Sequence, residues 1–128
     1  MQFPSELFYT SSHEWVRLES DGSMTVGITD LAQDSLGELV YVDLPLVGRT
    51  VSRGESCAVV ESTKAASDVY APVDGEIIAR NDALADTPQS VNEAPYGGGW
   101  LVRLKPTAPG AEKELMSSHQ YQSESGAH

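Results

Sequence analysis

The sequence contains little of what several classes of protein need. Its 128 residues include one cysteine, Cys57, which excludes an intramolecular disulfide framework and a multi-cysteine metal site. Cys57 stands beside Ala58 and Val59, so we expect a packed side chain rather than a nucleophile. No apolar run is long enough to span a bilayer, and the first residues form neither a secretory signal nor a transit peptide. We therefore expect a cytoplasmic protein.

Basic residues are also scarce. Lys and Arg total 8 against 19 Asp and Glu, which gives a net charge of -11. This balance disfavours nucleic acid and anionic membranes as partners, because phosphate binding needs basic clusters. It suits a monomer that resists self-association and docks on basic surfaces. A need for solubility alone explains the acidity equally well.

Metal and catalytic motifs are incomplete. His13-Glu14 matches the start of HExxH, but Arg17 occupies the position of the second histidine, and a zinc site needs three or four ligands. Ser12 and His13 are neighbours in sequence, which does not create a nucleophile and base, and no elbow motif surrounds the serine. We expect no metal site and no catalysis by this chain alone.

Short apolar stretches separated by turns favour an all-β sandwich or barrel. Asp21-Gly22 predicts a hairpin. The length fits one domain, with an N-terminal arm over residues 1–6 and a frayed tail over 123–128. The expected strands are Glu14–Glu19, Met24–Ile28, Glu38–Asp43, Thr50–Val51, Ser56–Glu61, Ala66–Tyr70, Glu76–Ala79 and Trp100–Lys105.

A few short helices interrupt this pattern. Asp30 and Gln33 have the spacing of a capping box, and Gly37 stands where a left-handed C-cap would end the helix. Pro109 suits the first turn of another helix. Further helical turns are expected near Gln89, over Ala111–Met116 and from Ser117 to Tyr121.

The stretch Val59–Tyr70 predicts a strand, a tight turn and a second strand, with Lys64 at the tip. Most lysines are simply exposed, but small neighbours leave this amine open to a modifying enzyme, and Glu61 stands three positions before it. Pro72 and Asp74-Gly75 follow at a spacing that predicts a second hairpin. These features favour a modified lysine.

Glu61-Ser62-Thr63-Lys64-Ala65, followed by Ser67-Asp68, resembles the lipoylation hairpin of the glycine cleavage system H-protein family. The resemblance extends over roughly Phe8 to Tyr121 and implies a mainly β barrel-sandwich hybrid (lipoyl/biotinyl-domain-like). It also implies a few short helices, one of them C-terminal, in a single lipoyl-carrier domain over residues 1–128. The other matching segments, in order, are Ser12–Val16, Val26–Asp30, Leu36–Val40, Leu44-Pro45, Val47-Gly48, Pro95-Tyr96 and Gly99-Trp100.

Related carrier families fit less well. Biotinyl domains typically have methionines beside the lysine, where this chain has Thr63 and Ala65. Lipoyl domains of 2-oxoacid dehydrogenases usually have Asp-Lys-Ala and precede Ala/Pro-rich linkers, which this chain lacks. The chain departs from the H-protein pattern at Thr63, where the family mostly has valine.

The resemblance implies a non-enzymatic carrier in glycine catabolism and one-carbon metabolism. Lipoic acid would be joined by an amide to Lys64, and Glu61 would help the lipoylating enzyme choose that lysine. Ser12, Glu14 and Asp68 would line the cleft that receives the aminomethyl arm. The implied partners are the pyridoxal-phosphate P protein (glycine decarboxylase), the tetrahydrofolate-dependent T protein (aminomethyltransferase) and the L protein (dihydrolipoamide dehydrogenase).

Two other hypotheses stay open. One is a lipoyl relay that only hands lipoyl groups to other enzymes, and the other is an unrelated acidic binding module with no modification. Genes for P and T proteins beside this one would favour the shuttle, and their absence from the genome would favour the relay.

Overall fold

The strands form two sheets in a computed structural model that describes residues 1–126. One sheet has six strands in the order β1-β2-β3-β9-β8-β5, and the other has three in the order β4-β6-β7. The strands are β1 (Phe8–Tyr9), β2 (Glu14–Leu18), β3 (Met24–Ile28), β4 (Leu39–Asp43), β5 (Thr50–Val51), β6 (Ser56–Ser62), β7 (Ala66–Tyr70), β8 (Gly75–Arg80) and β9 (Val102–Pro106). The predicted mainly β fold, a barrel-sandwich hybrid, is confirmed.

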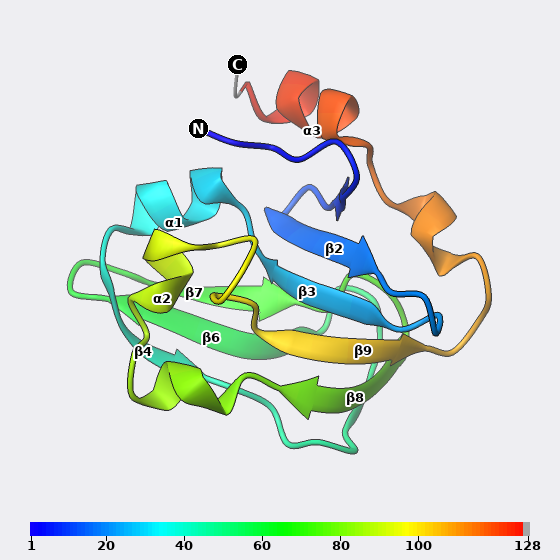
Figure 1. Cartoon of the computed structure of the whole chain (residues 1–128), viewed down its shortest axis with the longest axis horizontal. Coiled ribbons are helices and arrows are strands. Elements are labelled where there is room, and N and C mark those ends of the chain that lie inside the picture. The colour runs from blue at the N-terminus through cyan, green and yellow to red at the C-terminus, as the bar shows by residue number, and fades with distance from the viewer. Residues whose placement is uncertain (127–128) are drawn as a thin grey trace.

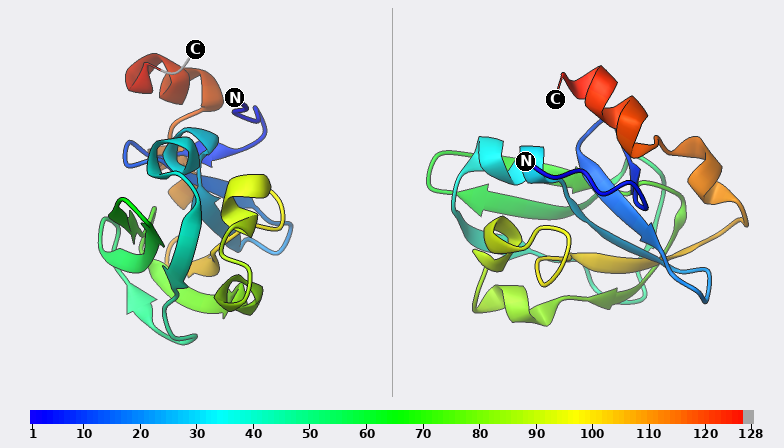
Figure 2. Two further views of the ribbon diagram at one scale, coloured as in Figure 1. Left: turned by 90° about the vertical axis from the view of Figure 1, so that its left-hand side faces the viewer. Right: turned by 45° about the horizontal axis from the view of Figure 1, so that its top comes forward.

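Within the part of the chain that the structure describes, five short helical segments accompany the sheets. They are α1 (Asp30–Leu36), η1 (Asp82–Ala85), α2 (Ser90–Glu93), η2 (Ala111–Glu114) and α3 (Ser118–Ser125). Figures 1 and 2 show α3 beside the N-terminal segment, over β1 and β2. The apolar faces of both sheets share one buried cluster, to which Val26, Val60, Val69 and Leu104 contribute. A second buried cluster of Leu7, Tyr9, Trp15 and Tyr121 joins the N-terminal part of the chain to α3.

The hairpin predicted at Asp21-Gly22 is confirmed. It joins β2 and β3, which pair antiparallel with Val16 opposite Val26. Gly22 has φ +89°, a left-handed conformation that glycine adopts without strain. The N–H and hydroxyl of Ser23 both donate to Asp21 Oδ1, at 2.9 and 2.6 Å.

The second hairpin predicted at Asp74-Gly75 is wrong. β7 belongs to the three-stranded sheet, whereas β8 pairs with β5 and β9 in the other sheet. The buried segment Ala71-Pro72-Val73 carries the chain between the sheets. Gly75 serves close packing rather than a turn, because a Cβ there would lie 2.4 Å from the backbone oxygen of Lys105.

The helix expected at Asp30 forms, but its N-cap is Thr29. The Thr29 hydroxyl accepts a hydrogen bond from Ala32 N–H at 3.2 Å, while Asp30 Oδ1 accepts one from the Gln33 side chain at 2.7 Å. Asp30 and Gln33 have the spacing of a capping box, but the hydroxyl of the preceding residue, Thr29, caps the helix. Gly37 ends the helix with the predicted positive φ, 81°, although its ψ of -168° is not left-handed helical.

Within residues 1–126, contacts hold parts of the predicted N-terminal arm and C-terminal tail. The arm over residues 1–6 is held where Tyr9 Oη donates to Pro4 O at 2.7 Å. The expected frayed tail begins inside α3, which continues to Ser125 because its N-cap Ser117 and the buried Tyr121 hold it. Residues 127 and 128 of that predicted tail lie outside the described residues. The 3-10 segment η2 ends at Glu114, short of the helix expected through Met116.

Candidate functional site

Lys64 lies at the tip of the β6–β7 hairpin, as predicted. The Ser62 hydroxyl accepts hydrogen bonds from Lys64 N–H and Ala65 N–H at 3.3 and 3.1 Å, and Ser62 N–H donates to Ala65 O at 2.8 Å. The side chain of Ser62 therefore fixes the turn. Lys64 is exposed, and its side chain passes the C-terminus of α1, where a Cβ on Gly37 would lie 3.5 Å from Lys64 Cε.

Glu61 lies on the strand that leads to this tip. It is half-buried and stands between Tyr41 on β4 and Ala66 on β7 in the strand register. Cross-strand neighbours share a face of the sheet, so Glu61 and the exposed Tyr41 present one surface beside the hairpin tip.

Glu14 is the most deeply buried carboxylate of the site, with 1% of its surface exposed. Its Oε1 accepts hydrogen bonds from the hydroxyls of Thr10 at 2.5 Å and Ser12 at 2.6 Å. Its Oε2 accepts one from Tyr70 N–H, at 3.2 Å, on the outgoing strand of the lysine hairpin. Burying a carboxylate is costly unless hydrogen bonds compensate. These three donors compensate, and the one from Tyr70 connects Glu14 to the hairpin.

A cleft of about 350 Å³ brings three predicted residues together. We call it the α1 cleft. Ser12, Glu14 and Asp68 line it, together with the α1 residues Leu31 and Leu36. Apolar side chains of both sheets, those of Ile28, Val60 and Val69, also line it. A cleft of this composition can hold an apolar chain that ends in a cation.

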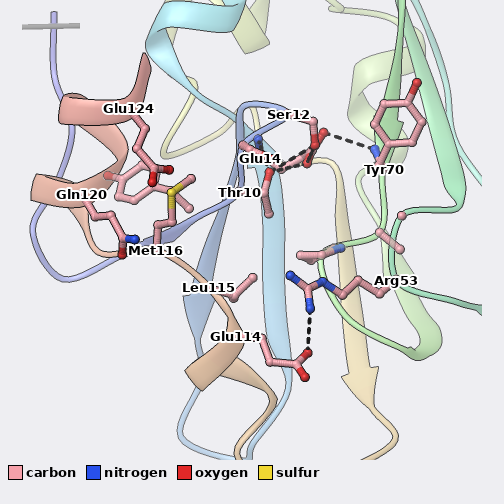
Figure 3. A pocket seen from close by; sticks show the side chains of 15 residues that line it. Thr10, Ser12, Glu14, Arg53, Tyr70, Glu114, Leu115, Met116, Gln120 and Glu124 are labelled. Atoms are coloured by element: carbon pink, nitrogen blue, oxygen red, sulfur yellow. Dashed lines mark hydrogen bonds and ion pairs between the residues drawn. The ribbon is translucent and has the colours of Figure 1, made fainter. Parts of the chain in front are cut away.

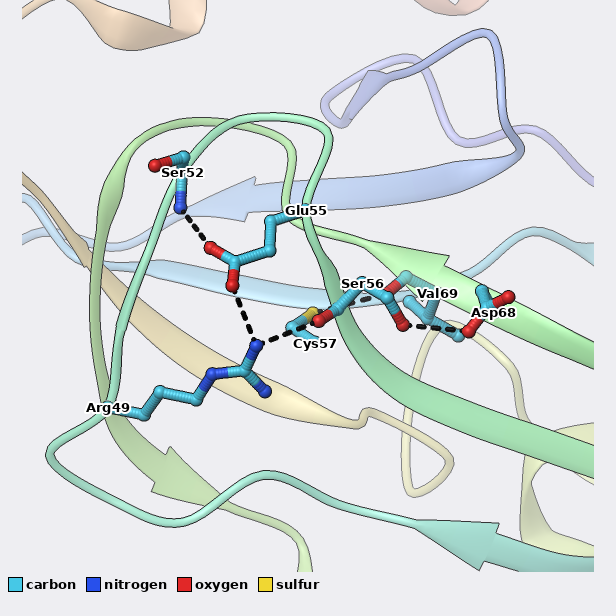
Figure 4. A network of polar contacts seen from close by, with 7 residues as sticks. All are labelled: Arg49, Ser52, Glu55, Ser56, Cys57, Asp68 and Val69. Atoms are coloured by element: carbon cyan, nitrogen blue, oxygen red, sulfur yellow. Dashed lines mark hydrogen bonds and ion pairs between the residues drawn. The ribbon is translucent and has the colours of Figure 1, made fainter.

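Asp68 reaches this cleft from the other strand of the hairpin. Its Oδ1 accepts a hydrogen bond from the Ser56 hydroxyl at 2.8 Å, within a polar network around the start of β6 (Figure 4). In the same network Arg49 donates to Glu55 at 2.9 Å and to Ser56 O at 3.1 Å. The backbone hydrogen bond from Ser52 and then the Arg49 guanidinium lower the pKa of Glu55.

A second cavity, of about 360 Å³, lies on another side of Glu14 (Figure 3). We call it the α3 cavity. Thr10, Ser12 and Glu14 line it, as do Gln120 and Glu124 of α3. An exposed ion pair between Arg53 and Glu114, at 3.1 Å, stands at its edge. Ser12 and Glu14 line both cavities, whereas Thr10 lines only the α3 cavity.

The sequence did not indicate the partners of the loop that carries these residues. His13 has φ 74°, a strained value for a residue other than glycine. Its Nδ1 is 2.7 Å from Tyr121 Oη, which is also 2.9 Å from Thr29 Oγ1. Burial raises the pKa of Tyr121. Residues 13 and 121 are 108 positions apart in sequence, so no local pattern could have revealed this contact.

Cys57 is buried, as predicted, and its thiol donates to Val69 O at 3.4 Å. Burial raises the pKa of the thiol to about 11, and the protonated form is a poor nucleophile. Within residues 1–126, no group of three or more His, Cys, Asp or Glu side chains could hold a metal ion. No helix in that part of the chain is long and apolar enough to cross a membrane.

Comparisons with known proteins identify the family of the chain. The family model described as Glycine cleavage H-protein matches residues 7–127. A glycine cleavage system H protein of Psychrobacter sp. (strain PRwf-1) is 57% identical over 121 residues, covering 94% of this chain and 96% of its own length. One from Escherichia coli (strain K12 / DH10B) is 55% identical over 119 residues, covering 93% and 92%.

A solved structure is also similar. The crystal structure of a glycine cleavage system H protein from Mycobacterium marinum matches with a TM-score of 0.87 and 45% identity, covering 96% of this chain and 98% of that one. Sequence and structure therefore agree over nearly the whole chain. The chain belongs to the glycine cleavage H-protein family, a carrier component rather than a catalyst.

Proposed function

We propose that this chain is the lipoyl carrier of a glycine cleavage system, with lipoic acid joined by an amide to Lys64. It takes the aminomethyl group from P protein (glycine decarboxylase), delivers it to T protein (aminomethyltransferase) and is reoxidised by L protein (dihydrolipoamide dehydrogenase). The observation that supports this best is an exposed lysine at a hairpin tip beside a cleft that contains a buried carboxylate.

The surroundings of Lys64 fit a covalently attached arm. Small neighbours and the turn fixed by Ser62 present the amine at the surface. Amide formation removes the lysine charge, and none of the ion pairs within residues 1–126 depends on Lys64. When bound, the lipoyl group supplies a long flexible arm and the dithiolane that carries the cargo. The chain supplies tethering, which raises the local concentration at each partner.

Glu61 is proposed as the residue by which the lipoylating enzyme selects Lys64. It lies three positions before the lysine and shares a surface with Tyr41, which is 53% exposed. An enzyme that approaches the hairpin tip would meet both side chains. Lys105 and Lys113 have no such acidic residue on a small-residue hairpin.

Ser12, Glu14 and Asp68 are proposed to receive the amine of the cargo in the α1 cleft. Ala66 and Asp68 are about 7 Å apart along β7 at the usual strand rise, so the cleft begins close to the tip. An amine that is cationic at neutral pH can form a charge-assisted hydrogen bond with a carboxylate, and excluding water suppresses hydrolysis. A lipoyl relay would need Lys64 but no such cleft, so the buried Glu14 favours the shuttle.

Lys64→Arg is the first test, with Lys105→Arg as the matched control. Lys105 is exposed on β9, and the same change there leaves the hairpin intact. In a reconstituted assay with P, T and L proteins, Lys64→Arg should abolish lipoylation and glycine cleavage while the circular dichroism spectrum stays unchanged. The control should behave as the wild type. Full activity of Lys64→Arg, or biotin in place of lipoate, would contradict the proposal.

Glu14→Ala tests the cleft separately from the arm. Lipoylation and reoxidation by L protein should change little, but the aminomethyl group should be lost faster once P protein is removed. A hydrogen bond to a charged group is worth about 1.5–3 kcal/mol, so a several-fold to roughly hundredfold faster loss is expected. Free thiol and formaldehyde report the decay. Equal decay in wild type and variant would show that Glu14 does not retain the cargo.

A further inference from the structure

The Thr10 hydroxyl contacts both the backbone and the buried carboxylate of Glu14. Its hydroxyl accepts a hydrogen bond from Glu14 N–H at 3.1 Å and donates one to Glu14 Oε1 at 2.5 Å. A hydroxyl has a single proton to donate. The backbone contact uses an acceptor lone pair and leaves that proton for the carboxylate.

The backbone around Thr10 is fixed as well. Thr10 N–H donates to Glu14 O at 3.0 Å, and His13 N–H donates to Thr10 O at 3.2 Å. The loop between them contains the strained His13. Thr10 and Glu14 are therefore joined by both main-chain and side-chain bonds, which restricts the rotamers open to the carboxylate.

The position of Thr10 separates it from the cargo. Thr10 lines the α3 cavity but not the α1 cleft, whereas Glu14 lines both. Ser12 donates to the same carboxylate oxygen but faces the α1 cleft, so it can also contact the cargo. Thr10 Oγ1 is also 3.3 Å from Ser12 Oγ, so Thr10 acts on the cargo through Glu14 and Ser12 and not by direct contact.

We infer that Thr10 is a positioning residue: its hydroxyl, on the α3-cavity side, locks the Glu14 carboxylate in the orientation that faces the α1 cleft. This inference rests on the proposed function for its effect on cargo retention. The locking of Glu14 itself does not, and it can be measured in the unmodified protein.

Thr10→Val keeps the shape of the side chain and removes the hydroxyl, and Thr10→Ser restores the hydroxyl. Ser11→Ala is the matched control, because Ser11 is an exposed neighbour that lines the same cavity. The first readout is side-chain ¹³C relaxation of Glu14 in the unlipoylated protein. Thr10→Val should lower the order parameter of the Glu14 side chain, while Thr10→Ser and Ser11→Ala should match the wild type. If Thr10→Val does not fold, Thr10→Ala provides the same comparison.

The second readout is loss of the aminomethyl group from the loaded protein. Thr10→Val should speed this loss about tenfold, as expected for one hydrogen bond to a charged group, and Thr10→Ser should restore retention. In a Ser12→Ala/Glu14→Ala background, Thr10→Val should add nothing, since both side chains that connect Thr10 to the cargo are then gone.

Each alternative outcome has one meaning. An equally rigid Glu14 in Thr10→Val, no rescue by Thr10→Ser, or a full additional effect in the Ser12→Ala/Glu14→Ala background would overturn the positioning role. If instead Glu14→Ala retains the cargo as well as the wild type, the proposed role of the cleft fails, and the relaxation result still decides whether Thr10 positions Glu14.

Discussion

Tyr121 is expected to hold the C-terminal helix over the site through its hydroxyl as well as its ring. The hydroxyl contacts His13 Nδ1 at 2.7 Å and Thr29 Oγ1 at 2.9 Å, and the ring stacks on Tyr9 with centroids 4.9 Å apart. Tyr121→Phe keeps the stack and removes only the hydroxyl. The variant therefore isolates the polar connection between α3, the His13 loop and the N-terminus of α1.

The size of the effect follows from burial. Thr29 and Tyr121 are 0% and 1% exposed, so water cannot replace that bond, and its loss should cost about 1–1.5 kcal/mol. His13 is half-buried, so water can compensate there and the cost should be about 0.5 kcal/mol. The free energy of unfolding should fall by about 2 kcal/mol. For a chain of this size that lowers Tm by about 6–10 °C.

Urea denaturation followed by circular dichroism measures this difference. Tyr41→Phe is the control, because Tyr41 is 53% exposed and a surface change should stay within about 0.5 kcal/mol. A free energy of unfolding for Tyr121→Phe that equals that of Tyr41→Phe would refute the argument that this hydroxyl connects α3 to the site.

Three further predictions concern pH, packing and charge. Burial raises the pKa of Tyr96 from 10.0 to about 12. The contribution of the neutral Tyr96 phenol to the free energy of unfolding is therefore complete below pH 10 and should be lost as the pH rises toward 12. Tyr96→Phe should weaken this loss of stability at alkaline pH, as measured by urea denaturation. Gly27→Ala should lower the free energy of unfolding by about 1–3 kcal/mol through overpacking, since a Cβ there would lie 2.6 Å from the Trp15 indole. A Cβ on Gly98 would have nothing within 4 Å, so Gly98→Ala should leave the free energy of unfolding unchanged in the same assay. With a net charge of -11, raising the salt concentration should raise KM for this chain with at least one partner more than it changes kcat, and a salt-independent KM with every partner would assign the acidity to solubility alone.

Local sequence patterns predicted those turns and helix ends whose conformation depends on the residues at that position alone. The Asp21-Gly22 turn and the Lys64 tip both form where glycine or small polar residues demand a turn. The end of α1 at Gly37 follows from its positive φ. The prediction of a second hairpin was wrong because Asp74-Gly75 has the composition of a turn, whereas Gly75 is required by the close approach of β9. A glycine can either form a turn or allow a neighbouring strand to pack closely, and tertiary contacts decide which of the two it does.

The candidate site was predicted only in part for the same reason. Ser12 and Glu14 are two residues apart and were identified through the family resemblance, and the structure joins them by a hydrogen bond of 2.6 Å. The bond from Tyr70 N–H to Glu14 spans 56 positions, and the contact between His13 and Tyr121 spans 108. No periodicity or motif encodes such pairs, so the support around Glu14 emerges only once the chain is folded.

Lys64 alone is proposed to carry the lipoyl group. Peptide mass spectrometry of the protein, purified from cells that contain the lipoylating enzymes, tests this proposal most directly. We predict lipoyl or octanoyl mass on the peptide that contains Lys64, and unmodified peptides for Lys105 and Lys113. A lipoyl group on either of those lysines, or a fully unmodified Lys64 in cells that lipoylate their other carrier proteins, would contradict the account.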